Sequence, residues 1–164
     1  MSGKAVRLVR LVPECEEGPS AALRYAETLS GVMLEDRAED RAQISPQEFL
    51  DVTDGWCRRT KGTSFAVVSG GDCIGMISIS RINSDDRTAY CGLFILREHR
   101  RRGFGRAAVE RLADIARSFG VGVLRGRVAL GDNTPVGFWG RLGAKVPEGE
   151  GEEHATVMID IDGL

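Results

Sequence analysis

Apolar and polar residues recur along the chain with two different periods, and each period predicts a type of element. Ala5–Val12 alternates loosely between apolar residues and arginine, which is typical of a half-buried strand. Ser20–Asp36 places apolar residues at steps of three and four, which predicts a helix with Ser20 as its N-cap. A second helix is expected to begin after Ser45, with Pro46 at its first position.

The middle of the chain has the period of strands. Ser64–Ser69 and Cys73–Ile82 are strand-like, and the glycines and aspartate of Gly70–Asp72 between them favour a hairpin turn. A third strand is predicted over Thr88–Leu96. These segments predict an antiparallel sheet at the centre of the fold.

The clearest amphipathic helix follows at Gly105–Phe119, with Phe119 in its apolar stripe and Gly120 at its end. Three further elements are a strand at Val121–Leu130, a short helix at Pro135–Leu142 and a last strand at His154–Ile161. The pattern predicts one α/β domain over residues 1–164, an α+β arrangement with a mixed, mostly antiparallel sheet flanked by helices.

Composition narrows the class of protein. With 42% hydrophobic and 28% charged residues, the 164-residue chain has the make-up of one globular domain. Its net charge of −2 argues against a nucleic-acid partner, because such proteins usually carry a broad basic excess.

The four cysteines are scattered without the spacing of a zinc site, so we expect reduced thiols and no metal. No apolar run approaches the roughly 18 residues that cross a bilayer, and no signal peptide opens the chain. A cytoplasmic protein without a membrane partner is expected.

The stretch Arg97–Ala108, REHRRRGFGRAA, gathers arginines around two glycines between a predicted strand and a predicted helix. Amides and the dipole at a helix start form an anion site, and glycines let a phosphate approach the backbone. Four arginines are placed to add charge-assisted bonds, namely Arg100, Arg101, Arg102 and Arg106. The pattern indicates pyrophosphate binding.

Other interpretations of this stretch compete. A run of arginines is often a solvated surface. A dinucleotide-binding fingerprint needs a third glycine where Ala108 stands, and a Walker loop needs a Gly-Lys-Ser/Thr sequence that is absent. An RNA-binding patch fits poorly with the acidic balance of the chain.

The segment ILREHRRRGFGRAAVERL closely resembles the nucleotide-binding motif of the GNAT superfamily of acetyl-CoA-dependent N-acetyltransferases, whose signature is Arg/Gln-x-x-Gly-x-Gly/Ala. GDNTPVGFWGRLGA is similar to the family's C-terminal segment, and the order of elements matches from about Val6 to Ile161. The resemblance implies a GNAT fold with an acetyl-CoA cleft between splayed central strands. It also implies transfer of an acetyl group to a primary amine of a small molecule or peptide, by direct attack in a ternary complex.

The resemblance carries over to individual positions. The implied cofactor-binding residues are Phe94, Ile95 and Leu96 on the strand, Arg100, Arg101, Arg102, Gly103, Phe104, Gly105 and Arg106 in the loop, and Asn133, Phe138 and Trp139 further on. Asp132 is an alternative to Asn133. A backbone N–H near Phe94 or Ile95 is expected to polarise the thioester carbonyl.

Two positions depart from the family pattern. Trp139 stands where many members have a tyrosine that protonates the leaving thiolate, and Ala89 stands where some have a glutamate base. Tyr90 and Asp86 are the catalytic candidates, with Asp85 as a neighbouring alternative, although a sheet-face aromatic and turn formers are the more ordinary roles for these residues. Cys91 is a candidate acetyl carrier, but a strand cysteine is normally a small buried hydrophobe.

The acceptor is expected to enter over Ser20–Arg59, where acidic residues at 35, 36, 39 and 40 offer attraction for a cationic amine or form a solvated charge run. Two alternatives remain open: an acyl-CoA-binding sensor or partner module with little turnover, and an enzyme that transfers a longer acyl chain. A homodimer is a further possibility that the resemblance suggests.

Overall fold

The computed structural model describes residues 5–12, 14–35, 44–129, 141–142 and 154–163. The elements in these ranges are β1 (Arg7–Val12), α1 (Pro19–Glu35), α2 (Pro46–Thr60), β2 (Thr63–Ser69), β3 (Asp72–Asn83), β4 (Thr88–Ile95), a 3-10 turn η1 (Arg97–His99), α3 (Phe104–Ser118), β5 (Val123–Ala129), β6 (His154–Asp160) and a 3-10 turn η2 (Ile161–Gly163).

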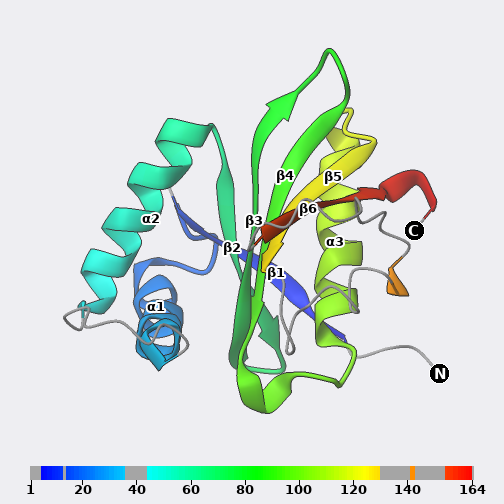
Figure 1. Ribbon diagram of the computed structural model, residues 1–164. Coiled ribbons are helices and arrows are strands. Elements are labelled where there is room, and N and C mark those ends of the chain that lie inside the picture. The colour runs from blue at the N-terminus through cyan, green and yellow to red at the C-terminus, as the bar shows by residue number, and fades with distance from the viewer. Residues whose placement is uncertain (1–4, 13, 36–43, 130–140, 143–153, 164) are drawn as a thin grey trace.

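The strands form a single sheet in the order β1-β2-β3-β4-β5-β6, with neighbours in sequence also neighbours in space. Every pair is antiparallel except β4 and β5, which are parallel and are connected through α3. Helices α1 and α2 lie on one side of the sheet and α3 on the other (Figure 1). The predicted mixed, mostly antiparallel sheet is confirmed.

Alternation along the strands creates a core on each side of the sheet. Ala66 packs with the fully buried Leu29 beneath α1 and α2, whereas its neighbour Val67 packs beneath α3 with Ile77 and Leu112. Burial on both faces explains why β2 is a nearly continuous apolar run rather than an alternating one.

The helix starts follow the predicted capping signals in part. The Ser45 hydroxyl accepts a hydrogen bond from the Glu48 N–H at 3.1 Å, so the predicted cap of α2 is confirmed. Helix α1 begins at Pro19, one residue before its predicted cap Ser20.

The predicted place of Phe119 in the apolar stripe of α3 is wrong, because its side chain is 61% exposed. The last helical residue is Ser118, and Phe119 follows as the C-cap with a φ of −98° and a ψ of 10°. Its side chain therefore leaves the buried face. Gly120, with a φ of +81°, ends the helix as predicted. The predicted helix Pro135–Leu142 lies almost wholly outside the described residues.

Candidate active site

The two parallel strands part after a short paired stretch. Strand β4 pairs with β5 only through Thr88, Ala89 and Tyr90, and its other edge stays paired with β3 as far as Ile95. Strand β5 continues along β6 to Ala129. In the described part of the chain no strand pairs with the β5-side edge of β4 beyond Tyr90. The central strands are splayed, as predicted.

The direction of the backbone groups determines what this open edge presents. The Leu96 N–H donates to the Ile74 carbonyl at 2.9 Å, and a Cβ on Gly75 would collide with the Phe94 carbonyl. The backbone of Phe94 and Leu96 therefore faces β3. Since successive peptide groups point to opposite edges of a strand, the backbone of Ile95 faces the open edge.

This alternation shows how the predicted strand residues are oriented. Of Phe94, Ile95 and Leu96, only Ile95 turns its backbone to the open edge, together with Leu93, which the sequence did not single out. The Ile95 carbonyl already accepts a hydrogen bond from the Nε of Arg100 at 2.7 Å. The edge thus offers the amides of Leu93 and Ile95.

Helix α3 begins directly after this edge and has no side-chain cap. Its N-cap is Gly103, with a left-handed φ of +86°, and the first turn contains no acidic residue. Ala107 donates to the Gly103 carbonyl at 3.1 Å, so the amides of Phe104, Gly105 and Arg106 precede the first bond inside the helix. A Cβ on Gly103 would have no other atom within 4 Å. The helix start opens onto space, as an anion site requires.

The loop arginines differ in what holds them. Arg101 and Arg102 are exposed, and Arg101 adopts a left-handed φ of +63°. Arg106 pairs with Glu110 at 3.1 Å, but both side chains are more than half exposed and the pair is weak.

Two of the predicted loop ligands also have structural roles. The Arg100 guanidinium carbon lies 5.3 Å from the centre of the Phe94 ring, so this side chain braces the loop against β4. Phe104 is buried in the core beneath α3, where its ring lies 5.9 Å from that of His99. Only the backbone of Phe104 is available to a ligand.

The two catalytic candidates lie in different surroundings. Tyr90 is half-buried at the point where the strands part, and the Arg81 guanidinium lies 5.9 Å from its ring centre. Asp86 precedes β4, and its Oδ1 accepts from the Thr88 hydroxyl at 2.6 Å and the Thr88 N–H at 3.2 Å. Asp86 therefore forms the turn, as the alternative interpretation proposed.

Sequence reasoning missed polar residues that share the face of Tyr90. Ser78 is buried next to the exposed Gly92, where a Cβ would lie 3.0 Å from the Ser78 hydroxyl oxygen. Arg125 pairs in register with Tyr90 across the parallel strands. The signal in the sequence was the placing of serines and an arginine at alternate positions within otherwise apolar strands.

Cys91 is unsuited to carry an acetyl group. It is buried beneath α3, and burial raises the pKa of its thiol to about 12. The interpretation as a small hydrophobe is confirmed. In the described ranges, no group of at least three His, Cys, Asp or Glu residues is arranged to hold a metal.

Several predicted residues lie outside the described residues. They are Asp36, Glu39 and Asp40 of the acidic connection and Asn133, Phe138 and Trp139 of the second motif, with Asp132 as the alternative to Asn133. None of the described helices is both long and apolar enough to cross a membrane.

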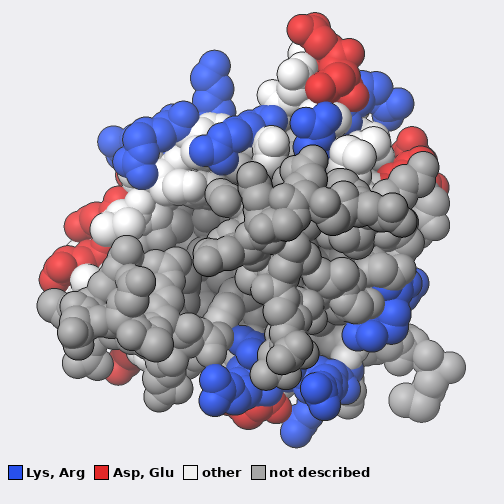
Figure 2. Space-filling model, viewed as in Figure 1, with Lys and Arg blue, Asp and Glu red and all other residues white. Residues whose placement is uncertain are grey.

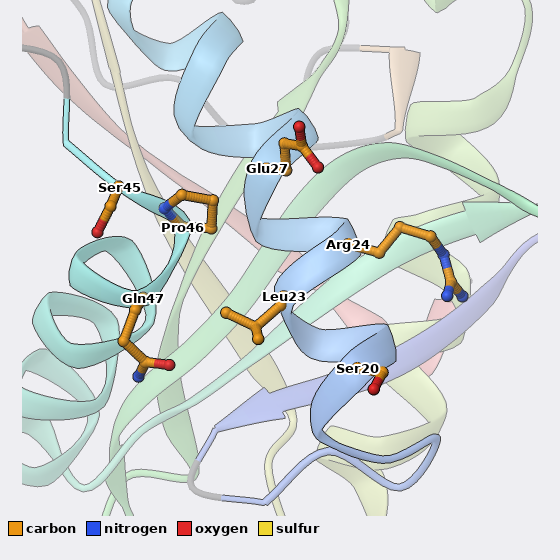
Figure 3. Close-up of a pocket in the computed structure, with 7 residues that line it drawn as sticks. All are labelled: Ser20, Leu23, Arg24, Glu27, Ser45, Pro46 and Gln47. Carbon is orange, nitrogen blue, oxygen red and sulfur yellow. The ribbon is translucent and has the colours of Figure 1, made fainter.

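A surface groove of about 520 Å³ lies between α1 and the start of α2, in the region where the acceptor was predicted to enter. Figure 3 shows Leu23 of α1 pointing toward Pro46 and Gln47, while Arg24 points away from α2. A second groove, of about 340 Å³, runs between the start of β1 and α3 and includes Gly103 and Arg106.

The sequence and the fold agree on one family. The model of the acetyltransferase (GNAT) family matches residues 31–144, well over half of the chain, and the chain belongs to this family. No curated protein matches the sequence significantly.

Solved structures share the fold at low sequence identity. A spermidine N-acetyltransferase from Vibrio cholerae in complex with CoA and spermine is 16% identical, with a TM-score of 0.69 over 96% of this chain and 95% of its own. The putative acetyltransferase yncA from Salmonella typhimurium, with its cofactor acetyl-CoA, is 14% identical, with a TM-score of 0.67 over 99% and 96%. FdhC, a nucleotide-linked sugar GNAT, is 14% identical, with a TM-score of 0.71 over 99% and 91%.

Proposed function

We propose that this protein is a cytoplasmic N-acetyltransferase that moves an acetyl group from acetyl-CoA to a primary amine of a small molecule or peptide. Membership of the acetyltransferase family supports the reaction class. The observation that carries the proposal is the continuity of the open β4 edge with the uncapped start of α3.

The residues along this path fit acetyl-CoA. The amides of Leu93 and Ile95 suit the carbonyl groups of the pantetheine arm, because they lie along an edge that β5 leaves unpaired. The first amides of α3 suit the diphosphate, and the exposed Arg101 and Arg102 suit its charge. The resemblance adds Asn133, Phe138 and Trp139 to the same site.

Acetyl-CoA supplies the acetyl group as an activated thioester. The chain then has to stabilise the oxyanion that forms when the amine attacks, and the amide of Leu93 or Ile95 is placed for this role. An alkylammonium has a pKa of about 10, so the amine must lose a proton before it attacks. Tyr90 and Asp86 remain the candidates for moving that proton, and geometry favours Tyr90 because Thr88 already engages Asp86.

Calorimetry with acetyl-CoA tests the binding half of the proposal through two matched glycines. Gly103 and Gly120 lie beyond opposite ends of α3, with φ values of +86° and +81° and open space at both Cβ positions. Gly103→Leu and Gly120→Leu therefore incur similar backbone strain. Only Gly103→Leu is expected to weaken binding, by at least roughly tenfold. Equal binding by the two variants would remove the loop from the site.

Release of free thiol from acetyl-CoA tests the catalytic half. The panel of acceptors contains polyamines, amino acids, aminoglycosides and peptides. An amine that raises thiol release above hydrolysis supports the transferase. If acetyl-CoA binds and no amine raises the rate, the chain is an acyl-CoA-binding module instead. Tyr90→Phe is expected to lower kcat and shift its pH profile if Tyr90 moves the proton.

A further inference from the structure

A row of four side chains crosses the sheet where β4 and β5 part. Ser80, Tyr90, Arg125 and Met158 are paired in register from β3 to β6. The residues one position away pack in the core beneath α3, namely Ile79, Ala89, Leu124 and Ile159. Because side chains alternate along a strand, the row faces the opposite side of the sheet, the side of α1 and α2.

Arg125 is the charged member of this row, and not all hydrogen-bond donors of its guanidinium have a partner. The side chain is 34% exposed, and its Nε is buried with no hydrogen-bond partner. A terminal nitrogen lies 3.9 Å from Asp86 Oδ2, which is too long for a hydrogen bond. The buried Nε is out of reach of a ligand, so the terminal nitrogens, which form no hydrogen bond with the described residues, are the donors that Arg125 offers where β4 and β5 part.

Further positive charge lies around this row. The Arg81 guanidinium lies 5.9 Å from the centre of the Tyr90 ring. The end of α2, which leads into Lys61, lies beside the row, since a Cβ on Gly62 would be 3.0 Å from the Ser80 Cβ. Figure 2 shows Lys and Arg side chains gathered along the upper edge of the molecule, the edge where α2 ends in Figure 1.

Acidic groups compensate this charge only in part. Asp54 pairs with Arg58 at 2.7 Å, and Asp86 faces Arg125. In the described ranges no carboxylate forms an ion pair with Lys61 or Arg81. In the described ranges, Lys61 and Arg81 therefore add positive charge beside the row.

We propose that Arg125 determines acceptor specificity by binding a carboxylate of the acceptor. This inference rests on the proposed function and deepens it. Adjacent strands lie about 4.8 Å apart, so a carboxylate on Arg125 leaves an amine a few bonds away within reach of the open edge of β4. The acceptor class is a free amino acid or a short amino carboxylate.

This acceptor class differs from that of the Vibrio cholerae enzyme, which was solved with spermine. A polyamine has no group for Arg125 to bind, and the guanidinium would repel it. The shared fold does not oppose the proposal, because the acceptor is determined by side chains at the site and not by the fold.

The test compares each L-amino acid with its carboxamide as acceptors, with lysine against cadaverine and spermidine as a further set. Wild type is expected to prefer the carboxylate by roughly 10- to 100-fold in kcat/KM, the range for a charged hydrogen bond. Arg125→Gln is expected to remove most of this preference. A wild-type preference for cadaverine or spermidine, or an unchanged preference in Arg125→Gln, would overturn the proposal.

Arg117 provides the matched control. Its side chain is 35% exposed, it has one buried unpartnered nitrogen and one acidic partner, Asp114, but it belongs to α3 on the other side of the sheet. Arg117→Gln should keep the carboxylate preference. Loss of the preference in both variants would indicate a general charge effect and overturn the site.

A binding measurement separates this proposal from the proposed function. The same amino acids and carboxamides are titrated into the CoA-bound protein. If thiol release fails for every acceptor, the transferase activity fails, and carboxylate binding that Arg125→Gln abolishes still supports the subsite. Absence of any carboxylate-dependent binding overturns the subsite even when transfer to other amines is observed.

Discussion

The two halves of the sheet differ in how their edges and faces are covered. In the half formed by β1, β2 and β3, the strands are paired along their length, and β2 is buried on both faces between α3 and the pair α1 and α2. In the other half, β4 leaves β5 after Tyr90, and exposed or half-buried residues run from Gly92 to Phe94. The closed half supplies the stability that lets the other half keep backbone and polar groups accessible.

The largest expected effect is a loss of stability from a cavity in the closed half of the sheet, the half formed by β1, β2 and β3. Leu29→Ala removes a fully buried side chain of α1 and should lower the free energy of unfolding by about 2–5 kcal/mol. Val52→Ala, at a position 64% exposed on α2, is the control and should stay within about 0.5 kcal/mol. Urea denaturation measures both. If Leu29→Ala lowered the free energy of unfolding as little as Val52→Ala is expected to, α1 would add little to the stability of the core.

A methyl group added where β3 meets β4 is expected to disturb both halves of the sheet. A Cβ on Gly75 would collide with the Phe94 carbonyl, so Gly75→Ala should force β3 and β4 apart and cost about 1–3 kcal/mol. Acetyl-CoA binding should weaken in the same variant, because the open edge of β4 moves. Gly71→Ala, where a Cβ meets nothing within 4 Å, is the control. Normal stability of Gly75→Ala would contradict the described register.

A methyl group on the open half is expected to affect activity more than stability. A Cβ on Gly92 would lie 3.0 Å from the Ser78 hydroxyl oxygen, a contact that rotation of that side chain can relieve. Gly92→Ala should therefore cost less than about 1 kcal/mol. Thiol release should fall roughly tenfold, because the methyl group lies next to the amide of Leu93, which is proposed to stabilise the oxyanion. Full activity would place the reaction elsewhere.

The smallest effect concerns the cysteines, which report on local opening of each half. Burial raises the pKa of Cys73 to about 11 and that of Cys91 to about 12, whereas Cys15 is half-buried. Because the thiolate is the reactive form, Cys15 should be alkylated first at pH 8, and Cys73 and Cys91 only after unfolding. Mass spectrometry of peptides measures the order. Alkylation of Cys91 before Cys15 would show that the open half unfolds locally beneath α3.

Local patterns in the sequence predicted the elements well because each depends on neighbouring residues. The Ser45 cap, the hairpin between β2 and β3, and the helix after Gly103 all follow from short-range chemistry. The exposure of Phe119 was missed because one residue beyond the end of a helix is enough to change the direction of a side chain.

The site was predictable only where it is continuous in sequence. The loop between Leu96 and Gly103 could be singled out as a candidate, whereas the row containing Ser80, Tyr90 and Arg125 joins three strands and is set by their register. Which backbone groups of β4 face the open edge also depends on its pairing with β3. Neither property is encoded in a single stretch of the chain.

The connection between β4 and β5 has a consequence for the order of folding. Strands β2, β3 and β4 follow one another through tight turns, and α3 comes next, so these parts assemble through contacts of short sequence separation. The pairing of Thr88 with Val123 closes a loop that contains the whole of α3. Closing this larger loop costs more chain entropy than closing the hairpins. We expect a folding transition state with the hairpins formed and β5 and β6 not yet docked, so that the gap between the parallel strands is the last part of the sheet to acquire its shape.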